Sequence, residues 1–134
     1  MISPQTALIY TMTLVSAVDR DMKDVELSLI GDIVKDLPAF ADFAPDWLPE
    51  ATAQCAEMLS NEEGLEAVLD VIASVLDPNL RETAYALALE VAAADGTVTP
   101  EEMRILEMLR YKLDIDRLVA AAIERGVRAR YATI

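Results

Sequence analysis

The chain of 134 residues contains no histidine and a single cysteine, Cys55. The lack of histidine removes the commonest general base and the usual zinc ligand, and a lone cysteine cannot form a disulfide within the chain. Without a histidine to activate its thiol, Cys55 is expected to be a small packed side chain. These absences predict a reducing compartment, and hence a cytoplasmic location.

Aromatic residues and glycine are also scarce. Phe, Trp and Tyr make up 5% of the chain, although 54% of it is hydrophobic, and there are only four glycines and six prolines. Aliphatic side chains must therefore fill the core, and little material remains for hairpin turns. The composition favours an all-α fold, and the length fits one domain covering residues 1–134.

Basic residues are few and unevenly placed. The net charge is −13, yet residues 104–134 carry seven basic and four acidic side chains. A surface this negative repels phosphate backbones, so we expect no nucleic-acid partner. The basic tail has two interpretations: contact with an anionic partner or membrane, or the ordinary enrichment of arginine near helix ends, which we favour. The charge pattern leaves the oligomeric state unknown.

The longest early hydrophobic run, residues 7–18, is too short to span a bilayer, and no Lys or Arg precedes position 20. It also continues directly into a motif that recurs later in the chain. We therefore expect a core helix rather than a signal peptide.

Hydrophobic spacing and proline positions predict a compact bundle of about seven helices. The first and fifth are apolar nearly all round, which predicts that they form the buried centre. Ser60 to Glu63 is expected to cap the fourth helix, and Gly126 to end the seventh. The predicted helices are Pro4–Val18, Asp24–Leu37, Pro49–Leu59, Glu62–Leu76, Leu80–Ala94, Pro100–Leu113 and Ile115–Arg125.

A motif occurs twice, 76 positions apart. Each copy ends an apolar helix with an Asp, turns, and places a Glu seven residues later at the start of the next helix: Asp19 with Glu26, and Asp95 with Glu102. The repetition predicts two pseudo-symmetric helix-turn-helix halves around the two buried helices.

These four carboxylates are the candidate ligands of a divalent cation, Ca²⁺ or Mg²⁺, because hard cations prefer oxygen ligands. Their spacing matches the fifth and twelfth positions of a calcium loop, and Gly96 lies where such a loop turns sharply. The earlier ligand positions are hydrophobic, so neither half is a complete site. Two facing halves can supply enough oxygens for one shared ion.

A purely structural interpretation stands beside the metal site. Thr99 and Glu102 form a capping-box pattern with Pro100 between them, which explains Glu102 without an ion. In the first copy Lys23 holds the capping position, so capping explains Glu26 less well. Asp19 and Asp95 can bond to the backbone of their own turns.

Glu90 lies in the otherwise apolar fifth helix. A buried charge without a partner is costly, so Glu90 is expected either to pair with an arginine or to approach the acidic turns. We favour the arginine.

At the paired motif, the chain resembles the TerB-type tellurite-resistance domain, which is also similar to the N-terminal part of the membrane-anchored DjlA co-chaperones. The likeness rests on residues 14–19 with Glu26 and on residues 92–102, and extends over nearly the whole chain. It implies a bundle of about seven helices, a divalent-metal site at Asp19, Glu26, Asp95 and Glu102, and a scaffolding role in bacterial stress or tellurite resistance. Arg20 stands where the family usually has glycine.

Together these observations predict a non-enzymatic domain without catalytic residues. We expect it to bind a divalent cation and a protein partner, and a membrane-associated protein is one candidate for that partner. Two alternatives remain open. One is a metal-dependent hydrolase whose acids hold an ion that activates water. The other is a structural adaptor without metal.

Overall fold

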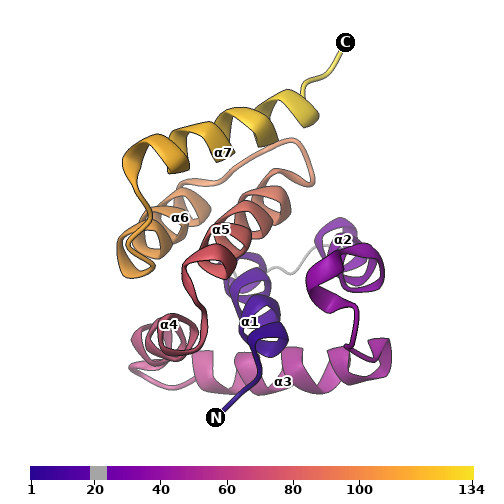
Figure 1. Cartoon of the computed structure of the whole chain (residues 1–134), viewed down its shortest axis with the longest axis vertical. Helices are drawn as coiled ribbons and strands as arrows, with labels where there is room; N and C mark the ends of the chain where they lie inside the picture. Colours follow the sequence, from indigo (N-terminus) through magenta and orange to yellow (C-terminus); the bar gives the residue numbers. More distant parts are fainter. Residues whose placement is uncertain (19–23) are drawn as a thin grey trace.

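The protein is described by a computed structural model that covers residues 1–18 and 24–134. Two helices, α1 (Pro4–Ala17) and α5 (Pro78–Ala93), pack against each other at its centre (Figure 1). Both begin with a side chain that accepts a backbone N–H, Ser3 in α1 and Asp77 in α5, followed by proline. Ten consecutive residues of α1, 7–16, are buried. The expectation that two apolar helices form the core is confirmed.

The remaining helices surround this pair, with α3 and α4 at one end and α6 and α7 at the other (Figure 1). Two short 3₁₀ helices, each opened by a proline, connect α2 to α3. The residues that the structure describes contain no strand, so the all-α prediction is confirmed. The outer elements are α2 (Asp24–Asp36), η1 (Pro38–Phe40), η2 (Pro45–Trp47), α3 (Leu48–Leu59), α4 (Gly64–Val75), α6 (Pro100–Lys112) and α7 (Arg117–Arg130).

The second helix of each repeat contacts the central helices of both repeats. α2 contacts α5 as well as α1, and α6 contacts α1 as well as α5. Each helix that follows a motif therefore packs on the central helix of both halves. This arrangement agrees with the two pseudo-symmetric halves that the duplicated motif predicts.

Most predicted helix ends lie within two residues of the observed ones, but two predicted caps are wrong. α7 continues through Gly126 to Arg130, because Val127 is buried and its burial offsets the helix cost of glycine, about 1 kcal/mol. Ser60 ends α3 rather than starting α4, whose first residue is Gly64. A β-carbon at Gly64 would lie 2.0 Å from the carbonyl oxygen of Met58, so the tight turn between α3 and α4 requires glycine.

An ion pair between Glu90 of α5 and Arg130 of α7 joins the two helices. Glu90 is 9% exposed, and it lies on the helix that α7 covers. The predicted arginine partner is confirmed. The pairing stabilises a carboxylate that burial would otherwise disfavour.

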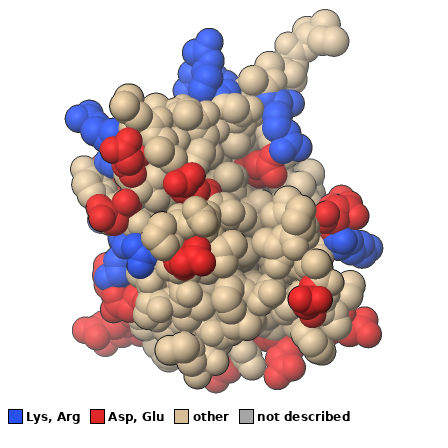
Figure 2. All heavy atoms as spheres, viewed as in Figure 1, with Lys and Arg blue, Asp and Glu red and all other residues tan. Residues whose placement is uncertain are grey.

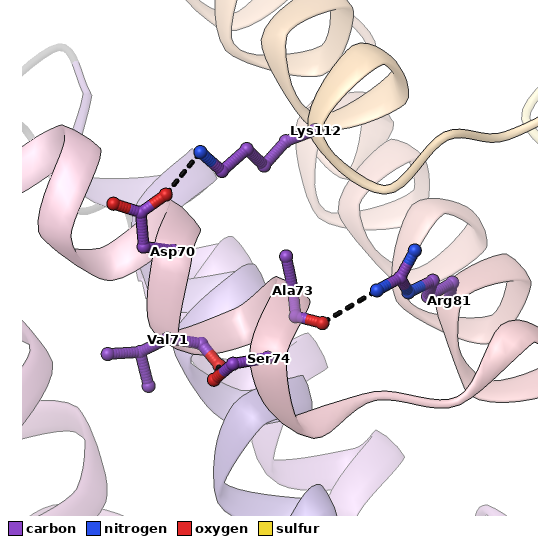
Figure 3. A network of polar contacts seen from close by, with 6 residues as sticks. All are labelled: Asp70, Val71, Ala73, Ser74, Arg81 and Lys112. Carbon is purple, nitrogen blue, oxygen red and sulfur yellow. Dashed lines mark hydrogen bonds and ion pairs between the residues drawn. The ribbon is translucent and has the colours of Figure 1, made fainter.

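One arginine connects the ends of two helices. Arg81 donates to the carbonyl oxygen of Ala73 at 2.7 Å (Figure 3). It also donates to the carbonyl oxygens of Leu76 at 3.0 Å, after α4, and of Leu113 at 3.3 Å, after α6. Beside it, an ion pair between Lys112 and Asp70 also joins α6 to α4. Carbonyl groups at helix ends have no partner within the helix, and the guanidinium supplies three donors to them.

No helix in the described part of the chain is both long enough and apolar enough to cross a membrane.

Candidate metal centre

Glu26 lies in the first turn of α2 and is 1% exposed. One of its carboxylate oxygens, Oε1, accepts a hydrogen bond from the hydroxyl of Ser16 at 3.1 Å. Ser16 is fully buried in the last turn of α1, so the bond links the two helices of the first repeat. A carboxylate in the protein interior is costly unless polar groups form hydrogen bonds with it, and the hydroxyl of Ser16 is one such group.

Glu102 occupies the matching place in α6 and is also 1% exposed. Its Oε1 accepts the backbone N–H of Thr99 at 2.9 Å, and its own N–H donates to the hydroxyl of Thr99 at 3.1 Å. This is the capping box that the sequence predicts. The structural explanation of Glu102 is therefore confirmed, while the burial of its carboxylate matches that of Glu26.

Asp95 lies in the exposed turn between α5 and α6. Its side chain accepts the N–H of Thr97 at 3.0 Å, and Gly96 has a φ of +85°. Both features follow the expectation that Asp95 bonds to the backbone of its own turn and that Gly96 makes the sharp reversal.

The neighbours of these carboxylates line two shared grooves. Val25 and Ala94, adjacent in sequence to Glu26 and Asp95, line a groove of about 320 Å³ between the start of α2 and the end of α5. Val18 lines a second groove, of about 470 Å³, which is formed mainly by α1, α3 and the start of α4, together with Ile105 of α6. The start of α2 in the first repeat therefore lies beside the end of α5 in the second.

Asp19, the fourth predicted ligand, lies outside the described residues. Within residues 1–18 and 24–134, no three acidic or cysteine side chains lie close enough to hold a metal ion together. The structure therefore does not bring Glu26, Asp95 and Glu102 together as a three-acid group. The donors available are carboxylate oxygens, which suit Ca²⁺ or Mg²⁺ rather than a softer metal.

Cys55 is fully buried in α3, with its thiol 3.7 Å from the carbonyl oxygen of Tyr10. Burial raises the pKa of this thiol to about 12. The thiol is therefore protonated at neutral pH, and the prediction of a packed side chain is confirmed.

The family model of tellurite resistance protein TerB matches residues 5–124. The chain belongs to the TerB family. The matched segment includes α1 to α6 and the first half of α7, and thus both acidic turns of this TerB-family domain. No curated protein and no solved structure matches the chain.

Sequence reasoning missed Ser16 as a partner of Glu26. Its signal was present, since Ser16 is a polar residue at the end of a mostly apolar helix, three positions before Asp19. A buried hydroxyl is stabilised by a hydrogen-bond partner, and Glu26 in the first turn of α2 is the partner of Ser16.

Proposed function

We propose that this TerB-family domain is a non-enzymatic cytoplasmic scaffold in bacterial stress or tellurite resistance. In this proposal it binds a divalent cation, Ca²⁺ or Mg²⁺, at the acidic turns of its two repeats and presents a charged surface to a protein partner. The proposed ligands are Asp19, Glu26, Asp95 and Glu102.

The burial of Glu26 and Glu102 is the observation that carries the proposal. Each is 1% exposed, and each lies in the first turn of the second helix of its repeat. Capping requires only a partly covered side chain, whereas a buried carboxylate has lost its hydration and gains from a nearby cation. The groove lined by Val25 and Ala94 supports the proposal, because it joins the start of α2 to the end of α5, just before the second acidic turn.

The structural adaptor without metal is the second candidate, and it also rests on specific contacts. Glu26 accepts from Ser16, Glu102 completes a capping box, and Asp95 accepts from Thr97. Each of these bonds gives its carboxylate a role that requires no ion.

Thermal unfolding with Ca²⁺, Mg²⁺ or Mn²⁺ separates the two candidates. A ligand at 100 times its dissociation constant stabilises the folded state by about 2.7 kcal/mol, so a bound ion should raise the melting temperature by several degrees. The double variant Asp19→Asn plus Asp95→Asn should lose that response.

The matched control is Asp36→Asn plus Asp46→Asn, which removes the same charge from two exposed positions away from the turns. It should keep the response of the unmodified protein. If no ion raises the melting temperature of the unmodified protein, the adaptor without metal is the correct function.

A further inference from the structure

A groove of about 450 Å³ lies at the end of the molecule away from α7. It is formed by the start of α1, the segment between α2 and α3, and α3 itself. Its polar and aromatic lining includes Ser3, Thr6, Asp42, Trp47, Glu50 and Gln54. No lysine or arginine lines it.

The aromatic wall of this groove is held in place from behind. Trp47 is 56% exposed, an unusual degree for a tryptophan. Its ring lies edge-to-face against Phe43, with centroids 5.3 Å apart, and Phe43 in turn lies 5.8 Å from Phe40. Because Phe40 and Phe43 are buried, they fix the indole while leaving it accessible.

The acidic wall is also ordered. Gln54 donates to Glu50 at 3.4 Å, and its own carbonyl oxygen accepts from Tyr10 at 3.4 Å. Tyr10 is 3% exposed, so this chain of hydrogen bonds positions Glu50 from the core. Asp42 adds a second exposed carboxylate to the lining.

The surrounding charge has one sign over a long stretch. Between Lys35 and Arg81 the sequence has ten acidic residues and no basic one. In the view of Figure 2, the lower end of the molecule, over α3, shows only acidic side chains among its charges, whereas Lys and Arg gather toward α7. A field of this sign attracts cations and increases the rate at which they arrive.

We propose that this groove binds an arginine or lysine side chain from a basic segment of a protein partner. The cationic group lies against the indole of Trp47, where the face of the ring attracts it, and pairs with Asp42 or Glu50. The inference specifies the partner of the proposed scaffold and rests on that function. A partner of opposite charge is favoured over a second copy, since two copies that each carry −13 repel one another.

Trp47 is the only tryptophan of the chain, so its fluorescence reports on the groove directly. The probe is a capped peptide of alternating arginine and alanine, titrated into the full chain. Its matched control is the same peptide with glutamine in place of arginine. We expect saturable quenching or a spectral shift with the arginine peptide alone, weakening as salt is raised.

The double variant Asp42→Asn plus Glu50→Gln removes both carboxylate charges from the groove and leaves its shape nearly unchanged. We expect it to weaken peptide binding about tenfold, through the loss of two carboxylates beside the cation. The control is Asp36→Asn plus Glu57→Gln, two exposed acids outside the groove that change the net charge equally. It should bind within about twofold of the unmodified protein.

Equal weakening by both double variants would overturn the proposal, because the peptide would then sense only the overall charge. An unchanged Trp47 spectrum at saturating peptide would also overturn it. Sedimentation of the protein alone tests whether a second copy occupies the groove. If the mass rises above 14.7 kDa with concentration, and the double variant Asp42→Asn plus Glu50→Gln reduces that rise, the groove binds a second copy instead. The melting response to divalent cations is measured separately, so failure here is distinguishable from failure of the cation site.

Discussion

The hydroxyl of Ser16 lies 3.1 Å from the carboxylate of Glu26, and both groups are buried. Ser16 belongs to α1 and Glu26 to α2, so this bond joins the two helices of the first repeat. In the second repeat the buried carboxylate of Glu102 has a different partner. It accepts the backbone N–H of Thr99, the residue that caps the same helix. The two equivalent acids therefore have inequivalent neighbours.

We predict that Ser16→Ala lowers the free energy of unfolding by about 1–3 kcal/mol, because it removes a hydrogen bond to a buried carboxylate. Urea denaturation followed by circular dichroism measures the change. Ser74→Ala is the control: its exposed hydroxyl bonds only to the carbonyl of Val71 in its own helix, and its loss should change stability by less than about 0.5 kcal/mol. Equal effects would show that the link between α1 and α2 contributes nothing special.

Arg81→Met is expected to lower the free energy of unfolding by about 2–4 kcal/mol. The substitution keeps an unbranched apolar stem but leaves the carbonyl groups of Ala73, Leu76 and Leu113 without their shared donor. Chemical denaturation at two salt concentrations measures it.

Lys112→Met is the comparison for Arg81→Met, because it removes the neighbouring ion pair with Asp70 (Figure 3). The hydrogen bond that Lys112 donates to Asp70 raises the pKa of Lys112, but the pair is exposed and screened by water. Its loss should shift the denaturation midpoint far less, and less still at high salt. The reverse order of the two variants would refute the role assigned to Arg81.

Arg130→Gln should loosen the end of α7. The variant leaves Glu90 without the ion pair that joins α5 to α7, at a cost of about 1 kcal/mol after allowance for the exposed guanidinium. Hydrogen exchange of the last turn of α7 should accelerate. Arg128→Gln, an exposed arginine on the same helix, should leave the exchange rates unchanged.

The thiol of Cys55 is expected to resist labelling by an aromatic disulfide reagent at pH 8 in the folded protein and to react promptly in urea. Its folded pKa of about 12 lies above that of an unfolded thiol, near 8.5. The unfolded chain therefore loses the proton first, and stability should fall as the pH rises from about 8.5 toward 12. Cys55→Ser provides the blank, and rapid labelling without denaturant would contradict the buried placement.

The number and approximate extents of the helices could be predicted from the sequence because their signals are local. Proline positions, caps such as Ser3 and Thr99, and the apolar runs of α1 and α5 each act within a few residues. The prediction failed at Gly126, where a glycine that usually ends a helix is overridden by the burial of Val127. The prediction that Ser60 caps α4 was also wrong, because the close packing of Gly64 on the backbone of Met58 determines the turn between α3 and α4.

At the candidate centre, too, local features could be predicted from the sequence and contacts between distant residues could not. The capping box and the turn at Gly96 could be predicted from the sequence, because they depend on residues close together in the chain. The shared site of four acids stays a prediction. The sequence did not reveal that Ser16 would meet Glu26, or that Trp47, Asp42 and Glu50 would share a groove, because these groups come from different elements.

By itself, the sequence determined an acidic all-helical domain with two apolar central helices and a repeated acidic turn, because periodicity, capping and charge are properties of neighbouring residues. The tertiary structure alone decided which distant groups meet: Glu90 with Arg130, Arg81 with the ends of α4 and α6, and the ordered tryptophan beside two carboxylates. Those contacts depend on how helices pack, and packing depends on the shape of many side chains at once.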